Sequence, residues 1–308
     1  MAYDTLVIFV TKRCNLRCPF CIWVSRDPDF FTGEEMTLEQ VEEILRYFHS
    51  RKFKGAWILA EGEILVYPHF RQAVELASSI GFPKGPLITN GILIDEHLDF
   101  IAKNFKNISV SIDGPDFKEF KKIRGSNEHT FNRILENVRI LVEMKKKVKI
   151  NFVIQKNNMY NAMRMTELCR TLGVKHMEFR NFHPIGSGVD LVPLYSDDRE
   201  AQKLVQDLKY VKSGVVVVPP VLHNRKIKSC RCNGMLNKTV LIGANGDFQP
   251  CCHMPSGSKW GNFWNDPEGY FNSEEKKKLI CDIAGTTCRS EIPSSCLDCT
   301  RLTTKRKD

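Results

Sequence analysis

The sequence lacks any long hydrophobic run. No apolar stretch among its 308 residues approaches the roughly 18 residues that a bilayer crossing requires. The short run at residues 6–10 is followed by Lys12 and Arg13 rather than by a cleavage site of small residues, so it does not resemble a secretion signal. Glycine and proline are not enriched, which excludes collagen-like and low-complexity proteins. We therefore expect a globular protein of the cytoplasm with no membrane partner.

Acidic residues are fewer than basic ones, 36 against 45, which gives a net charge of +9. Such a balance suits nucleic acid, an acidic substrate or an anionic cofactor. The basic runs at 145–147, 276–278 and 305–307 are typical of solvated helix faces and a frayed end. Nucleic acid is therefore not favoured as a partner.

Cysteine, by contrast, is abundant, with twelve residues. In a chain of this length without an export signal, thiols stay reduced, and metal binding or catalysis explains them better than disulfides. They form two groups and one isolated residue, and the two groups indicate two sites: first Cys14, Cys18 and Cys21; then Cys169 alone; and finally Cys230, Cys232, Cys251, Cys252, Cys281, Cys288, Cys296 and Cys299.

Short β-branched runs alternate with amphipathic stretches up to about residue 181. Six strands are predicted, at 5–10, 56–60, 86–89, 108–112, 148–154 and 176–180. Helical spacing of apolar residues follows Thr37 and Thr130, which we expect to cap their helices. This alternation favours right-handed βαβ units, and hence an α/β fold with a parallel sheet or a partial barrel.

The pattern changes near residue 190. A helix is expected around 197–211, followed by a strand at 215–220 and a cysteine-rich segment with a β-hairpin. The hairpin strands are 239–242 and 247–250, joined through a turn at 244–246. We therefore predict two domains, residues 1–190 and 191–308.

The first cysteines, Cys14, Cys18 and Cys21, lie in the loop directly after the first predicted strand. Three thiolates can hold three irons of a cubane and leave the fourth iron open to a substrate. A structural zinc site would need a fourth ligand, and the nearest histidine, His49, falls inside a predicted helix. Buried free cysteines are the remaining alternative.

The segment Cys14-Asn-Leu-Arg-Cys18-Pro-Phe-Cys21 resembles the CxxxCxxC signature of the radical S-adenosylmethionine (radical SAM) superfamily. The resemblance implies a partial (β/α)6 TIM-like barrel and a [4Fe-4S] cluster whose open iron binds SAM. It also implies reductive cleavage of SAM to methionine and a 5′-deoxyadenosyl radical that takes a hydrogen atom from the substrate. Phe20 occupies the aromatic position that lies near the adenine in the family.

The stretch Glu61-Gly62-Glu63-Ile64 resembles the family motif Gly-Gly-Glu-Pro, which receives the SAM amino group. Gly62 and Glu63 match this motif, whereas Glu61 and Ile64 depart from it. The resemblance thus assigns Gly62 and Glu63 to SAM binding.

Two further SAM contacts follow from the resemblance. Ser111, after the fourth predicted strand, is a candidate for the ribose or the carboxylate, and the fork of Arg124 can pair with the carboxylate. For Arg124 a surface salt bridge is the alternative. Thr89-Asn90-Gly91, after the third strand, also falls where the family places a similar triplet.

The later cysteines resemble the twitch domain, the shortened form of the SPASM domain, which consists of a β-hairpin plus a helix. This resemblance implies a second, auxiliary [4Fe-4S] cluster. Zinc suits four thiolates equally well, and Cys230 is an alternative to Cys232. Cys281 and Cys288 fit no spacing, and Cys169 reads as a packed core thiol. The four expected ligands are Cys232, Cys251, Cys296 and Cys299.

Cys252 is adjacent to the ligand Cys251, and neighbouring residues on a strand project to opposite sides. Its thiol can therefore return a hydrogen atom to a substrate radical, as in radical SAM epimerases that this Pro-Cys-Cys arrangement resembles. Epimerisation is our first expectation, and two-electron alcohol dehydrogenation through the auxiliary cluster is the alternative. A role for Cys252 as a bystander or as an alternative cluster ligand also stays open.

The first strand begins almost at the first residue, so we expect no peptide-recognition domain before it, which favours a sugar, a cyclitol or another small polar molecule. A short leaderless peptide stays open as a substrate. Arg180 and His183, near the end of the sixth strand, suit an acidic ligand. An electron donor such as flavodoxin or ferredoxin is the expected protein partner. A different class of protein, a non-catalytic zinc-stabilised module that binds nucleic acid, predicts colourless protein and salt-dependent binding to polyanions.

Overall fold

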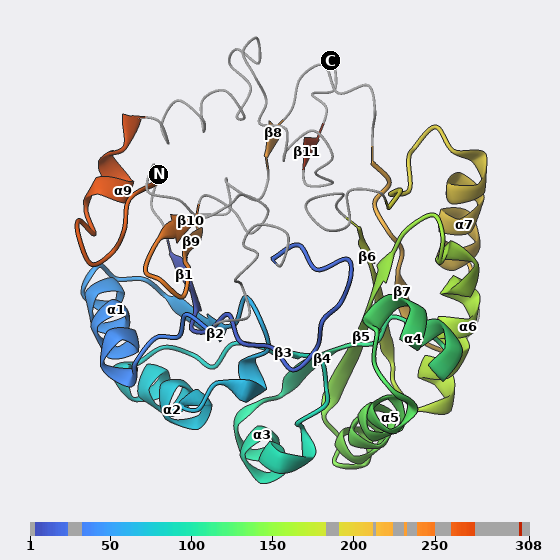
Figure 1. Ribbon diagram of the computed structural model, residues 1–308, viewed down its shortest axis with the longest axis horizontal. Helices are drawn as coiled ribbons and strands as arrows, with labels where there is room; N and C mark the ends of the chain where they lie inside the picture. The colour runs from blue at the N-terminus through green and yellow to red at the C-terminus, as the bar shows by residue number, and fades with distance from the viewer. Residues whose placement is uncertain are drawn as a thin grey trace. The chain divides into compact units, whose positions relative to one another are not determined.

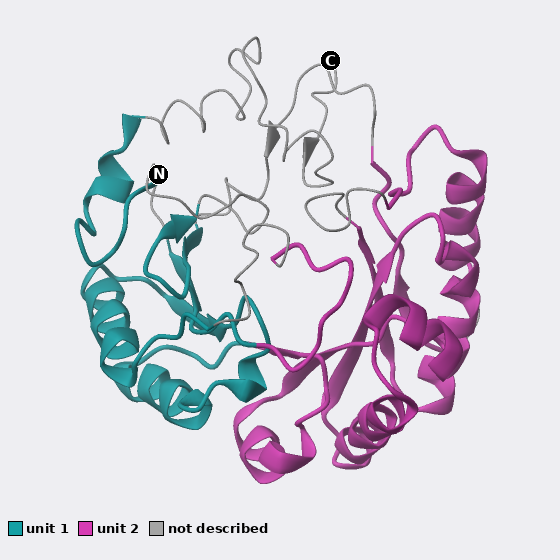
Figure 2. Ribbon diagram, viewed as in Figure 1, with its two compact units in different colours: residues 1–13, 28–85, 225–308 teal, residues 14–27, 86–224 magenta. Residues whose placement is uncertain are grey.

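The computed structural model describes residues 4–23, 33–182, 191–211, 214–223, 239–249 and 260–274, and the backbone of 231–232 and 302–303. The chain forms two compact units (Figure 2). The first comprises Met1–Arg13, Pro28–Gly85 and Arg225–Asp308, and the second comprises Cys14–Asp27 and Pro86–Asn224. The predicted division at residue 190 stays a prediction. Within the described residues, no helix has the length and apolar character needed to span a membrane.

The first unit contains a four-stranded sheet in the order β10-β9-β1-β2 (Figure 1). Helix α1 begins after Thr37, as predicted, because Thr37 and Gln40 form a reciprocal capping box. Its apolar positions are buried. The elements are β1 (Thr5–Phe9), α1 (Leu38–Ser50), β2 (Gly55–Leu59), η3 (Ile64–Val66), α2 (Phe70–Ile80), β9 (Thr239–Ile242), β10 (Phe248–Gln249) and α9 (Gly269–Asn272).

The predicted hairpin is confirmed, because β9 and β10 pair antiparallel. Strand β9 also pairs in parallel with β1, with Thr5 opposite Thr239. The sequence pattern did not indicate this second pairing, which joins strands more than two hundred residues apart. A two-residue ladder, β8 (Arg231–Cys232) with β11 (Leu302–Thr303), places Cys232 opposite Leu302.

The second unit contains a parallel five-stranded sheet in the order β3-β4-β5-β6-β7. All six predicted strands are therefore present, two in the first unit and four in this one, and the α/β fold with parallel sheets is confirmed. Its elements are β3 (Leu87–Thr89), η4 (Asp95–His97), α3 (Leu98–Asn104), β4 (Asn107–Ser111), α4 (Phe117–Arg124), α5 (Glu128–Glu143), β5 (Lys147–Ile154), η5 (Met159–Asn161), α6 (Ala162–Thr171), β6 (His176–Asn181), α7 (Arg199–Lys209) and β7 (Val216–Val218).

One predicted cap is wrong. Helix α5 begins after Asn127, whose side chain accepts a hydrogen bond from the backbone N–H of Thr130. Asparagine is at least as good an N-cap as threonine, so the helix starts three residues before the predicted position. The interior strand β5 buries every second residue, from Val148 to Ile154, and leaves polar side chains on its other face.

Candidate active site around the cysteine loop

The cysteine loop, residues 14–21, belongs to the second unit and is shaped by its own backbone. The N–H of Leu16 donates to Cys14 Sγ at 3.4 Å, and the N–H of Cys21 donates to the carbonyl of Cys18 at 3.1 Å. Arg17 donates to the carbonyls of Cys14 and Leu16. The three cysteines are partly exposed and form no disulfide. None of the three thiols is therefore consumed in a disulfide.

Arg124, at the last position of α4, lies against this loop. Its guanidinium donates to Cys18 Sγ at 3.5 Å and to Asp113 Oδ2 at 2.5 Å from Nε, and the second nitrogen Nη2 forms an ion pair with the same carboxylate. Asp113 is fully buried, and its other oxygen accepts the N–H of Val153 at 2.6 Å. The surface salt bridge considered for Arg124 is thus wrong, because the pair is buried and lies beside a cysteine of the motif.

At Cys18 and Arg124, burial and the neighbouring charges shift the pKa in opposite directions. Burial raises the pKa of the Cys18 thiol, and Arg124 partly offsets that effect. Burial works to lower the pKa of Arg124, but the negative charges of Asp113 and Cys18 outweigh it and raise the pKa. The guanidinium stays protonated and supplies a fixed positive charge next to the Cys18 sulfur.

The Phe20 ring packs against the Arg124 guanidinium. The ring lies 5.5 Å from the Arg124 guanidinium carbon, within cation–π distance, and it packs with Ile123 and Phe182. Cys18 and Val153 contact the same cluster. The aromatic position of the motif therefore anchors the cysteine loop onto α4 and β5.

Helix α4 is itself fixed by a polar network behind the site. The Glu119 carboxylate accepts hydrogen bonds from Lys122 Nζ at 2.6 Å, Tyr160 Oη at 2.6 Å and Asn161 Nδ2 at 3.0 Å. Lys122 is the main cause that lowers the pKa of Glu119 to about 2, with help from Tyr160 and against the effect of burial. This carboxylate thus connects α4 to η5 and holds the helix that presents Arg124.

The loop after β2, in the first unit, contains the Gly-Glu motif. The N–H of Glu63 donates to the carbonyl of Arg13 at 2.8 Å, and a Cβ on Gly62 would lie 2.0 Å from that oxygen. Only glycine fits, because the clashing atoms are backbone. Glu63 is buried and caps η3 through the N–H of Leu65. The departure at Glu61 is explained by Gln249 of β10, whose amide donates to Glu61 at 2.6 Å.

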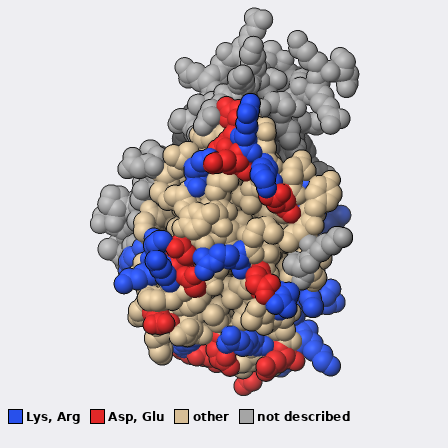
Figure 3. Space-filling view, turned by 90° about the vertical axis from the view of Figure 1, so that its right-hand side faces the viewer, with Lys and Arg blue, Asp and Glu red and all other residues tan. Residues whose placement is uncertain are grey.

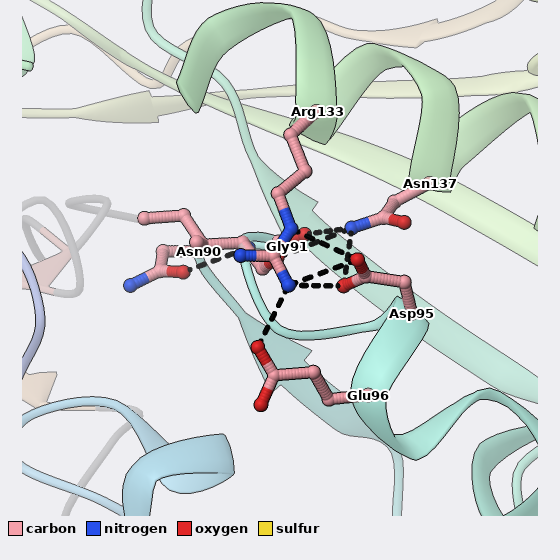
Figure 4. A network of polar contacts seen from close by, with 7 residues as sticks. Asn90, Gly91, Asp95, Glu96, Arg133 and Asn137 are labelled. Atoms are coloured by element: carbon pink, nitrogen blue, oxygen red, sulfur yellow. Dashed lines mark hydrogen bonds and ion pairs between the residues drawn. The ribbon is translucent and has the colours of Figure 1, made fainter. Parts of the chain in front are cut away.

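The loop after β3 has polar contacts to α5, which Figure 4 shows, and to the cysteine loop. Asn137 donates to the carbonyl of Gly91 at 2.9 Å, and Arg133 forms ion pairs with Asp95 and Glu96 on the same loop. Asn90 accepts the N–H of Ile92 and donates to Asn15 Oδ1 at 2.7 Å. Because Asn15 follows Cys14, the predicted triplet after β3 positions the cysteine loop.

One face of the five-stranded sheet is polar next to this loop. Half-buried Ser111 is in register with Asn151, and Asn151 with Glu178. Glu178 accepts from Lys149 Nζ at 2.5 Å and from Arg180 Nε at 2.9 Å. Val153, two residues beyond Asn151 on the same face, contacts the cysteine-loop cluster. Two residues span about 7 Å along a strand, so the polar row lies close to the site.

The donor set fits an iron–sulfur cluster. Three thiols lie on one loop, with a backbone N–H directed at Cys14 Sγ and a guanidinium at Cys18 Sγ. Both contacts favour the thiolate form, at Cys18 against the larger effect of burial. Within the described part of the chain, no three His, Cys, Asp or Glu side chains converge on one metal ion. Each thiolate of a cubane binds a different iron, so convergence on one point is not required. A cluster held by Cys14, Cys18 and Cys21 would supply one-electron chemistry at this site.

Other residues singled out from the sequence lie outside the described part of the chain: Cys251, Cys252, Cys296, Cys299, the alternative ligand Cys230, the unassigned Cys281 and Cys288, and His183. For Cys232 only the backbone is described. Cys169 is fully buried, as predicted, and burial raises the pKa of its thiol to about 12. The sequence prediction missed Asp113 as a partner and Asn15 altogether. One feature of the sequence could have identified Asp113 as the partner of Arg124. It is an acidic residue that follows a predicted strand and shortly precedes the helix with Arg124.

Basic and acidic side chains are interspersed on the face shown in Figure 3. Among the described residues several charged side chains form ion pairs, for example Lys156 with Asp198 and Arg164 with Asp116. On this face the net charge of +9 is therefore not gathered into a single basic patch of the kind that polyanion binding favours.

Comparison with known proteins agrees with this geometry. The chain is 23% identical over 274 residues to the subtilosin biosynthesis protein AlbA of Bacillus subtilis, covering 88% of this chain but only 60% of AlbA. It is 25% identical over 215 residues to a probable GTP 3′,8-cyclase of Saccharolobus solfataricus, covering 68% of this chain and 67% of the cyclase. The crystal structure of Streptococcus suis SuiB bound to its precursor peptide SuiA matches with a TM-score of 0.68 and 18% identity, covering 98% of this chain and 70% of SuiB, which shows a shared fold.

The family model described as the radical SAM superfamily matches residues 8–168, which is more than half of the chain. The matched region begins in β1 and includes the cysteine loop, the Gly-Glu loop and the Asp113–Arg124 pair. This chain belongs to the radical SAM superfamily.

Proposed function

We propose that Cys14, Cys18 and Cys21 bind a [4Fe-4S] cluster with SAM on its open iron, and that the enzyme abstracts a hydrogen atom from a small polar substrate. The observation that carries this proposal is the three-thiol loop with Arg124 directed at the Cys18 sulfur. Five residues are proposed to bind SAM, namely Phe20, Gly62, Glu63, Ser111 and Arg124.

The test is metal content and SAM cleavage after anaerobic iron reconstitution. The wild type should be brown and should split SAM into 5′-deoxyadenosine and methionine under a strong chemical reductant. Cys18→Ala should abolish this cleavage and lose about one cubane of iron. Cys169→Ala is the matched control, because it removes a buried thiol away from the loop. Colourless, zinc-containing protein without SAM cleavage would contradict the proposal.

For the second cysteine group we propose an auxiliary [4Fe-4S] cluster on Cys232, Cys251, Cys296 and Cys299. The register of β8 with β11 supports it, since Cys232 lies opposite Leu302, three residues after Cys299 in the sequence. Two cubanes predict about eight irons per chain. About four irons together with one zinc would instead assign this site to zinc.

A short peptide is the substrate we favour among the small polar molecules. AlbA takes part in the biosynthesis of a bacteriocin, and SuiB was crystallised with a precursor peptide. The polar sheet face supports the choice, because half-buried Lys149 and Glu178 and exposed Arg180 offer charges of both signs, which suits a zwitterionic backbone or an acidic side chain.

Epimerisation is the reaction that we propose for this substrate. Abstraction of hydrogen leaves a carbon-centred radical, and the Cys252 thiol returns a hydrogen atom to the opposite face. The sulfur radical left on Cys252 then needs one electron and one proton, which an electron donor and solvent supply. If the auxiliary cluster instead accepts an electron from the substrate radical, the product is the oxidised form of the substrate.

Conversion in deuterated buffer separates these outcomes. For any substrate that the enzyme converts, epimerisation predicts one solvent deuterium in the wild-type product and no epimerised product from Cys252→Ala. Cys169→Ala should behave as the wild type. An oxidised product that persists in Cys252→Ala would remove the thiol-donor proposal and favour dehydrogenation.

A further inference from the structure

A hollow of about 430 Å³ adjoins the cysteine loop within the second unit. Its walls come from the loop between Cys14 and Cys18 and from the segment running from α4 to the start of α5. The lining includes Asn15, Leu16, Arg17, Phe117, Lys121 and Arg124.

The lining of this hollow is basic. It contains Arg17, Lys121 and Arg124, and none of its nine residues is acidic. Asp113, which pairs with Arg124, is fully buried and does not line it. Lys121 and Arg17 are exposed, and no ion pair joins Lys121 to a carboxylate among the described residues. The hollow therefore presents uncompensated positive charge at Lys121.

Two side chains that line the hollow also contact the proposed cluster ligands. Arg124 lines it and at the same time donates to Cys18 Sγ at 3.5 Å, and Arg17 lines it and donates to the carbonyl of Cys14 at 2.7 Å. Electron transfer slows steeply with the distance between donor and acceptor. A one-electron carrier that docks here would approach the cluster closely.

We infer that this hollow is the docking surface for a small acidic one-electron carrier protein, which delivers its electron to the cluster proposed on the cysteine loop. The inference rests on the proposed function, because it needs that cluster. Charge complementarity selects the partner: an acidic surface is attracted by Arg17 and Lys121, and such transient complexes depend on steering by charge more than on a large buried area. One electron passes from the reduced carrier to the cluster, so the carrier is oxidised and the cluster is reduced by one electron.

The test compares two reductants on the iron-reconstituted full chain. Cluster reduction is followed by EPR, with either dithionite or a reduced flavodoxin as the donor. Lys121→Glu should raise the flavodoxin concentration needed for half-maximal reduction rate at least tenfold at low salt and change the dithionite result less than twofold. Added salt should weaken flavodoxin-driven reduction of the wild type.

Lys175→Glu is the matched control. Lys175 is exposed just before β6, so its reversal changes the net charge equally without touching the hollow, and it should leave both reductions within twofold of the wild type. An unchanged flavodoxin dependence in Lys121→Glu would overturn the inference, as would an equal effect of Lys175→Glu or an equal loss with both reductants. Wild-type protein that shows no cluster even with dithionite would contradict the proposed function instead.

Discussion

The loops after β2 and β4 both contain or adjoin residues proposed to bind SAM, but different forces fix them. The loop after β2 is held by backbone hydrogen bonds to Thr11 and Arg13 and by the missing side chain of Gly62. The loop after β4 is held by a buried charge pair, Asp113 with Arg124. The steric requirement can be seen in the sequence as a glycine. The charge pair cannot, because Asp and Arg are common residues and nothing in the sequence links these two.

The largest expected effect is at the charge pair. Asp113→Asn keeps an acceptor for the N–H of Val153 but leaves the Arg124 guanidinium buried without a counter-charge. Removal of one partner of a buried pair costs about 3–5 kcal/mol, so the free energy of unfolding in urea should fall by that amount. Glu167→Gln, which breaks an exposed pair with Arg170, should leave it unchanged. An equally small effect of both variants would show that charge does not hold the β4 loop.

The steric side of the comparison is tested by Gly62→Ala. The new Cβ would meet the backbone of Lys12 and Arg13, which cannot rotate away, so the loop must shift and lose the bond from Glu63 to Arg13. We expect a loss of about 3 kcal/mol in the free energy of unfolding. Gly55→Ala is the control, since its nearest atom would be a methyl of Thr5 at 3.9 Å. If the two variants are equally stable, the β2 loop does not depend on this close approach.

The loop after β3 is an intermediate case that depends on one side chain. Asn90→Ala should cost about 2 kcal/mol, because the buried N–H of Ile92 loses its acceptor. Asn90→Asp keeps that acceptor and removes the donation to Asn15. Both variants should retain less iron after reconstitution if Asn90 positions the cysteine loop, and full iron retention by both would refute that role.

The smallest effect is expected behind α4. The pKa of Glu119 is about 2 in the folded protein against 4.5 for an unperturbed carboxyl. Between these values the unfolded chain binds more protons, so this stabilisation is present at pH 7 and is lost as the pH falls from about 4.5 towards 2. Glu119→Gln should cost about 1 kcal/mol at pH 7. In urea unfolding at several pH values, the gap to the wild type should close over that window; a constant gap would argue against the carboxylate as its origin.

The order and type of the elements could be predicted from the sequence because they depend on local patterns. The capping box at Thr37, the alternation in β5 and the turn between β9 and β10 each involve a few neighbouring residues. The start of α5 was predicted wrongly, because Asn127 and Thr130 are both acceptable caps and only the packed helix decides between them. The pairing of β9 with β1 could not be predicted, since no local signal identifies a partner so distant in the chain.

The sequence by itself carried the resemblance to the radical SAM superfamily, because the motif of Cys14, Cys18 and Cys21 lies within one short stretch of the chain. Only the tertiary structure decided that the Arg124 charge lies beside the Cys18 sulfur, with Asp113 buried behind it and a basic hollow in front. The physical reason is that the covalent chain fixes the spacing of residues in a motif, whereas the charges around a residue depend on how distant segments pack together.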